Sequence, residues 1–211
     1  MTTQDELSPI INKPSIQRLT IFGYCAFLST LLIGMTFLSS LLGATEGISE
    51  VSLLLSPLPL IPASITWVPY LELNHRQFQV IKIIMGVTSI LCVIGVIGIT
   101  LKWIQMGSPI NFLRTILLTL LALAGFWFPI LGVFSLANHA APFGLSLSSI
   151  MTGISWLGII SSTLANLFDP EFIQRRLNLL GPNFVLWLIS QSVFAIWLGI
   201  WLLKHRGVNS S

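Results

Sequence analysis

Three histidines and one glutamate are the residues of this chain whose types and spacing could do chemistry. Glu72 precedes His75 by three positions, so a helix would carry both side chains on one side. This Glu-x-x-His spacing occurs in carboxylate-bridged metal sites built inside helical bundles. The candidate metal ligands are Glu72, His75 and His139. The reaction class would be that of a metal-dependent membrane enzyme.

A structural role explains the same residues with fewer requirements. A carboxylate-bridged site needs several inward-facing acids, and the long apolar stretches carry none away from their ends. Glu72 has a partner in Arg76, one helical turn further on. A haem between two histidines would need both inside facing helices, which none of His75, His139 and His205 satisfies. We therefore expect no cofactor, and metal binding stays an alternative.

Other catalytic patterns are missing from the sequence. It contains no HExxH motif, no phosphate loop and no dinucleotide-binding glycine pattern. The apolar stretches also lack the titratable groups that acid–base catalysis requires. We therefore name no catalytic residue, and a role other than catalysis is the favoured expectation.

Composition places the chain in a membrane. Only 8% of its 211 residues are charged, against about 25% in soluble proteins, and the mean hydropathy is +0.89. The ten basic residues are scattered without a run that could follow a phosphate backbone, so no nucleic-acid partner is expected. Cys25 and Cys92 lie within apolar stretches and are interpreted as packing residues. The expected class is a multi-pass integral membrane protein.

The elements that must position these residues are six apolar stretches, each near the ~20 residues that cross a bilayer as a helix. They predict an all-α bundle of six transmembrane helices at about 19–43, 51–73, 80–101, 113–136, 145–168 and 184–203. Residues 1–18 and 204–211 are expected to be cytoplasmic tails around this single domain, 19–203. Residues 170–180 are predicted to form a short interfacial helix that Gly181 and Pro182 end.

Residues 51–73 decide the topology, because this stretch carries prolines at positions 57, 59, 62 and 69. A proline inside a helix costs about 3 kcal/mol in water, and the carbonyl that it frees must find a partner in lipid. The stretch therefore spans only as a kinked helix enclosed by protein, or it re-enters and leaves five spans. We favour six, since 23 such residues outside the membrane would be a large exposed apolar patch.

Orientation follows from the basic residues near the ends of the spans. In both topologies the side holding the amino terminus carries six of the ten basic residues, which favours a cytoplasmic amino terminus. The connections are short, which suits a bacterial plasma membrane. In both topologies the three histidines also share one membrane face.

A few uncharged polar and small residues inside the spans invite a specific role. Gln191 is expected to make a hydrogen bond between helices or to contact a substrate. Ser155, Gly158 and Ser162 share one face of span five, and we expect that face to pack against protein. The interrupted stretch around Pro57, Pro59 and Pro62 is where a transporter would bind its substrate.

The favoured function is that of a non-catalytic accessory or assembly protein that acts through helix–helix contacts. Its expected partners are the lipid bilayer and other membrane proteins or a second copy of the chain. The first alternative is a small transporter or channel, and the second is the metal-dependent membrane enzyme.

Overall fold

The structure is a computed structural model that describes residues 14–41, 55–71, 73–106, 125, 127–168 and 170–205; the side chains of several helical residues, 159–184 among them, fall outside this description. Over this part of the chain the fold is all helical and contains no strand. This confirms the all-α class. The elements are α1 (Ile16–Leu41), α3 (Leu60–Trp67), the 3-10 helix η1 (Val68–Tyr70), α4 (His75–Met106), α6 (Trp127–Ala137), α7 (Phe143–Phe168) and α8 (Pro170–His205).

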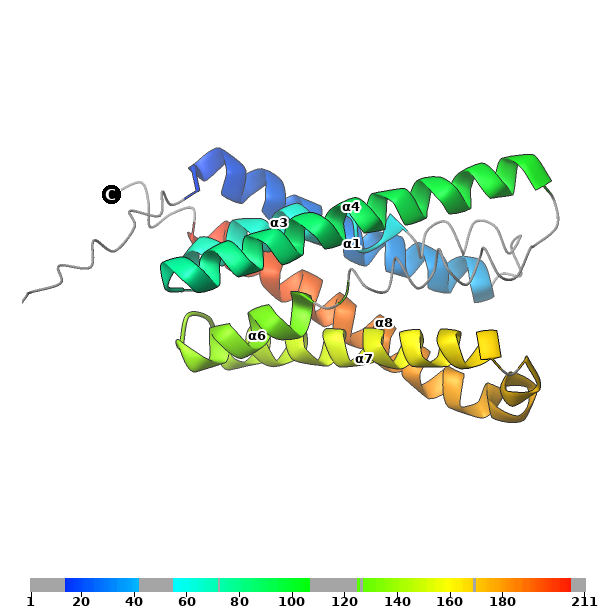
Figure 1. Ribbon diagram of the computed structural model, residues 1–211. Coiled ribbons are helices and arrows are strands. Elements are labelled where there is room, and N and C mark those ends of the chain that lie inside the picture. The colour runs from blue at the N-terminus through cyan, green and yellow to red at the C-terminus, as the bar shows by residue number, and fades with distance from the viewer. Residues whose placement is uncertain are drawn as a thin grey trace, which may run out of the picture.

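The last helix, α8, packs against α1, α3 and α7 (Figure 1). It runs antiparallel to α1, because Gly23 near the start of α1 lies beside Gly199 and Leu203 near the end of α8. The face that α1 buries recurs every three or four positions and consists of Leu19, Gly23, Ala26, Ser29, Ile33 and Thr36. Small residues on this face let the two helices approach closely.

A hairpin of α6 and α7 forms the other side of the bundle (Figure 1). Ser149 of α7 donates a hydrogen bond of 2.7 Å to the carbonyl of Phe128, and Ser146 donates one of 2.7 Å to the hydroxyl of Ser135. Both bonds are buried, so hydroxyl groups and not ion pairs tie these two helices together. Span four was predicted at 113–136, and its residues 113–124 and 126 lie outside the described part.

Within the described residues 55–71, the proline-bearing stretch forms a turn, the helix α3 and the 3-10 helix η1. Pro59 is the N-cap of α3, Pro62 lies in the first turn of α3, and Pro69 lies at the start of η1. The first backbone N–H groups of a helix have no partner within it, so a proline there removes no hydrogen bond. From 55 to 71 only Ile65 is exposed. The segment is therefore enclosed by protein, as expected.

The carboxyl-terminal helix differs from the sequence prediction. Gly181 and Pro182 were expected to end a short interfacial helix, but α8 continues from Pro170 to His205 without a break in its helical backbone. Proline removes one backbone donor, and the helical backbone of α8 continues through this loss.

Two described segments, Ile16–Leu38 and Val185–His205, have the length and the hydropathy of membrane-spanning helices. The first has a mean hydropathy of 1.9 over its apolar window, and the second has the same value. Trp127–Ala137 is apolar but shorter. These two long segments point to membrane insertion.

Candidate functional site

We call one end of the bundle the histidine end, because His75, His139 and His205 lie there. η1 and α8 both finish at this end, and the connection between α6 and α7 turns there (Figure 1). α4 begins with His75, four residues after Leu71, and the carbonyl of Leu71 accepts a hydrogen bond from Asn138. The three histidines therefore come from separate elements of one end.

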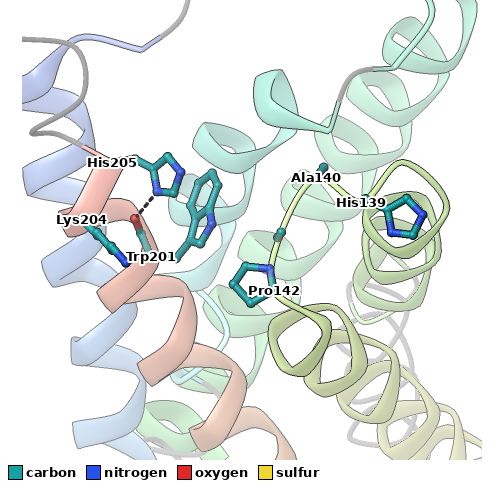
Figure 2. A pocket seen from close by; sticks show the side chains of 7 residues that line it. His139, Ala140, Pro142, Trp201, Lys204 and His205 are labelled. Carbon is teal, nitrogen blue, oxygen red and sulfur yellow. Dashed lines mark hydrogen bonds between the residues drawn. The ribbon is translucent and has the colours of Figure 1, made fainter. Parts of the chain in front are cut away.

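A hollow of about 540 Å³ opens between the end of α8 and the connection from α6 to α7 (Figure 2). It is lined by His139, Ala140, Ala141, Pro142, Trp201, Lys204 and His205. Three of these seven residues carry basic nitrogen atoms, and none carries a carboxylate. The wall on the α8 side is aromatic and basic, while the opposite wall is small and apolar. Such a hollow suits a ligand with negative charge and an apolar part.

The aromatic wall holds the His205 ring in a defined position. His205 stacks on Trp201 with ring centroids 3.9 Å apart, and Tyr70 packs edge-on against Trp201 at 5.0 Å. Nδ1 of His205 lies 2.9 Å from the carbonyl oxygen of Trp201. A carbonyl only accepts hydrogen bonds, so Nδ1 carries the proton and Nε2 is the nitrogen available to a ligand. The hydroxyl of Tyr70 is buried and has no hydrogen-bond partner among the described residues.

The opposite wall is fixed by a helix-ending motif. After α6 the N–H of His139 bonds to the carbonyl of Leu136, and the N–H of Ala140 bonds to that of Ser135. This is the Schellman pattern, and its left-handed position is occupied by His139 at φ 51°. The side-chain nitrogen of Asn138 donates to the carbonyl of Leu71 at 2.6 Å, which ties the connection to the end of η1.

The candidate metal ligands do not assemble in the described part of the chain. His75 is exposed at the start of α4, and His139 is exposed on the α6–α7 connection, with its ring directed away from Trp201 (Figure 2). Glu72 lies outside the described residues. Among the residues that are described, no three His, Cys, Asp or Glu side chains gather into a metal-binding group. Cys25 is a free, half-buried thiol of α1.

Gln191 lies at the centre of a separate buried polar cluster. Its side chain is fully buried, and Nε2 donates to Ser56 Oγ at 3.2 Å and to Ser29 Oγ at 3.4 Å. These contacts join α8 to α1 and to the turn before α3, which is the interhelical bonding that the sequence predicts. The carbonyl oxygen Oε1 of Gln191 is buried and has no partner among the described residues.

The other predicted residues are buried or half-buried where the structure describes them. Pro57 is buried in the turn before α3, whereas Pro59 and Pro62 are half-buried at its start. Ser155 is buried, donates to the carbonyl of Met151 at 2.8 Å and lies 3.4 Å from the hydroxyl of Ser190 on α8. Gly158 is half-buried in α7; Ser162 is also in α7, and its side chain lies outside the description. The described members of the small-residue face thus pack inside the bundle.

Sequence reasoning missed the hollow at the histidine end. Trp201 and His205 are four residues apart, and this spacing puts two side chains on one face of a helix, so the stacked pair had a signal in the sequence. The opposite wall had none, because Asn138 and Leu71 meet only through the tertiary fold. Ser29 and Ser56 as partners of Gln191 were missed for the same reason.

No protein-family model matches this chain, and neither a curated protein nor a solved structure matches it.

Proposed function

We propose that this chain is a multi-pass integral membrane protein whose helices act through contacts with other membrane proteins. The observation that carries its placement in a membrane is the arrangement of α1. The exposed face of α1 is large and apolar, with Ile21, Tyr24, Leu28, Leu31, Met35 and Leu38, while its buried face contains glycine, alanine, serine and threonine. Only 28% of its most apolar 18-residue stretch is buried inside the bundle. A core helix of a soluble protein buries its large apolar residues, so lipid is the surrounding that fits this helix.

The order of the helices supports six spans over five. α1 begins at the histidine end and leads away from it, whereas Tyr70 packs edge-on against His205 at 5.8 Å, so residues 55–71 lead back to that end. α4 then starts there and runs away again (Figure 1). This order is compatible with one crossing between α1 and α4. α7 supports a further span, because its 26 residues carry no charge. With the amino terminus cytoplasmic, as in a bacterial plasma membrane, the histidine end faces the cytoplasm.

A non-catalytic role is supported by the chemistry of the interior. All buried polar side chains in the described part of the chain are serine, threonine or glutamine. None of these titrates near neutral pH, so this interior offers no group for acid–base catalysis. What the protein presents to its surroundings is apolar helix surface, and this favours an accessory or assembly subunit.

α4 provides the surface for a partner helix in this proposal. Within the described bundle α4 packs mainly against α3 and α6. Its exposed apolar residues are Val80, Ile83, Val87, Ile90, Val93, Ile94 and Ile97. The small-residue face of α7, in contrast, is used by α6 and α8. A Gly158→Leu change would therefore report on folding and not on association.

Photo-crosslinking in the native membrane tests the accessory role. A photoreactive amino acid at Ile83 or Ile90 of α4 is expected to capture one defined membrane protein or a second copy of the chain. The matched control places it at Leu28 or Leu31, on the exposed face of α1, which is expected to yield lipid adducts. Lipid adducts from both helices would contradict the proposal.

A small transporter is the second candidate, and one specific observation favours it. Three of the buried polar atoms that have no hydrogen-bond partner among the described residues are relevant here. Two of them, Oγ of Ser64 and Nε1 of Trp67, belong to α3 of the proline-bearing stretch, and the third is Oε1 of Gln191 on α8. Unsatisfied polar groups line the paths of polar solutes. In the accessory role a Ser64→Cys variant resists water-soluble thiol reagents as completely as an Ile65→Cys control. Reaction at position 64 alone would favour transport.

A further inference from the structure

We propose that the hollow at the histidine end binds a phosphate group, with Trp201, Lys204 and His205 as its ligands. The phosphate can belong to a phospholipid headgroup or to a soluble phosphate compound. This inference does not depend on which protein partner the helices contact, and it concerns residues that neither the metal site nor the transport path would use.

The side chains of α8 supply the donors. Lys204 is exposed and lines the hollow. Its ammonium group is therefore hydrated in the free protein and is available to a ligand in the hollow. Nε2 of His205 is the ring nitrogen that the carbonyl of Trp201 does not engage, so it is available for a hydrogen bond to a ligand. In Figure 2 the indole nitrogen of Trp201 lies on the ring edge that faces the α6–α7 connection. Trp201, Lys204 and His205 thus all line the same hollow.

The stacking of His205 fixes the orientation of its ring. The ring lies 3.9 Å from that of Trp201 with an angle of 27° between the planes. A ring that is held in this way needs no further ordering when a ligand binds. The wall across the hollow adds to the positive potential, because α7 begins at Phe143 beside Pro142 and presents the positive end of its dipole.

The position of the hollow is compatible with a lipid headgroup as the source of the phosphate. The apolar stretch of α8 ends at Lys204 and His205, the depth at which tryptophan and basic residues meet lipid headgroups. Ala140, Ala141 and Pro142 form an apolar wall that an acyl chain or glycerol backbone can contact. An alternative role for Lys204 and His205 is to compensate the negative end of the α8 dipole, which requires only a cation in the last turn. It would not require a hollow or a fixed ring.

Native mass spectrometry of the full chain in detergent tests the proposal. The 23.2 kDa protein is titrated with phosphatidylglycerol, with phosphatidylcholine, and separately with inorganic phosphate. We expect a single adduct that Lys204→Gln with His205→Gln weakens about tenfold or more, the effect of losing hydrogen bonds to a charged group. The matched control is Lys82→Gln with His75→Gln, which removes the same residue types from exposed positions of α4.

Each outcome decides one point. A phospholipid adduct that depends on Lys204 and His205 identifies the lipid headgroup as the source, and a phosphate adduct with the same dependence but no lipid adduct identifies a soluble ligand. Absence of both adducts, or an adduct that the control pair weakens equally, overturns the proposal. The single Lys204→Gln change sits on an exposed side chain and keeps the test valid if the double variant does not fold.

Discussion

His139 occupies a backbone position that favours glycine. Its φ of 51° is left-handed, and the Cβ atom of an L-residue is crowded there by the following carbonyl. The position exists because α6 ends in a Schellman motif, which needs a left-handed residue to direct the N–H groups of His139 and Ala140 back to α6. The side chain is exposed, so its packing does not repay this strain.

Replacing His139 by glycine is expected to stabilise the protein by up to about 1 kcal/mol, because glycine adopts the left-handed region without strain. The measurement is the midpoint of thermal unfolding of the full chain in detergent. His139→Ala is the control, since it removes the ring but keeps the Cβ atom, and it should show no gain. An equal gain from alanine would place the effect in the ring and contradict the backbone argument.

Gln191 is the second residue whose environment makes a sharp prediction. It is fully buried among hydroxyl groups and carries no charge. Gln191→Glu would bring a carboxylate into this interior, at a cost of about 3 kcal/mol for a charged side chain in the middle of a membrane helix. Gln191→Leu removes the amide together with its unpaired Oε1, and is expected to change stability by less than about 1.5 kcal/mol.

The two Gln191 variants are compared by thermal unfolding in detergent and by yield from the membrane. A large loss for glutamate with a small loss for leucine would agree with a dry interior. If glutamate were tolerated as well as leucine, water would reach Gln191, and the balance would move from the accessory role to the transporter.

At the scale of elements, glycine sets how closely α6 and α7 pack. A Cβ atom added to Gly153 would lie 2.1 Å from Cδ of Pro129, whose ring is fixed to the α6 backbone. A Cβ atom added to Gly144 would lie 1.8 Å from the ring of Trp197, but that ring is a 42% exposed side chain of α8. The first clash can be relieved only by separating two helices, whereas the second can be relieved by rotating a side chain.

Gly153→Ala is therefore expected to destabilise the protein by about 1–3 kcal/mol, the range for overpacking a well-packed contact. Gly144→Ala should cost less, although its Cβ would make the closer approach. Gly34→Ala serves as the control, because nothing lies within 4 Å of its added Cβ and alanine favours the helix. All three are ranked by thermal unfolding in detergent, and an equal cost for Gly144 and Gly153 would contradict this account.

The helices that the sequence predicts well are those whose bounds follow from the length of an uncharged stretch. α7 was expected at 145–168 and lies at Phe143–Phe168, and α1 was expected at 19–43 and lies at Ile16–Leu41. The predictions differ from the structure where proline was the guide. Pro59 and Pro62 fall at the start of α3, Pro69 falls where α3 passes directly into η1, and Pro182 falls inside α8. A proline marks a missing N–H group, but only the tertiary fold decides whether that group would have had a partner.

The candidate site was predictable only in part for a related reason. Counting spans predicts that His75, His139 and His205 share one end, and the described helices bring them there. The hollow depends instead on the bond from Asn138 to Leu71 and on the edge-on contact of Tyr70 with Trp201. These pairs are separated by 67 and by more than 100 residues, so no local pattern in the sequence encodes them.

At the scale of the whole molecule, the exposed faces of the described helices fit the membrane bundle that we propose. The exposed residues of α1, α4 and α8 include 20 or so large apolar side chains, a surface that would make a soluble protein aggregate. The buried faces combine apolar and aromatic side chains with serine, threonine and glycine. In lipid this arrangement is stable, because close packing and hydroxyl hydrogen bonds hold the helices together where no hydrophobic force between them exists.

Labelling of single cysteines tests the six-span topology of the whole chain. Cys25 and Cys92 are first replaced by alanine, and cysteines are then placed at His75, at His139 and at position 169, between α7 and α8. In sealed bacterial membrane vesicles, an impermeant thiol reagent is expected to reach positions 75 and 139 from the cytoplasmic side and position 169 from the opposite side.

The outcomes follow from the order of the helices. Because α7 lies between positions 139 and 169, these two positions must lie on opposite sides of the membrane if α7 spans it. Positions 75 and 139 are separated by α4 and by the stretch that ends in α6. Positions 75 and 139 lie on the same side of the membrane if both segments cross it, or if neither segment does. Position 90, in the middle of α4, decides between these two cases. Protection of Ile90→Cys from the reagent means that α4 crosses the membrane. Labelling of 75 and 139 from opposite sides would exclude the six-span bundle.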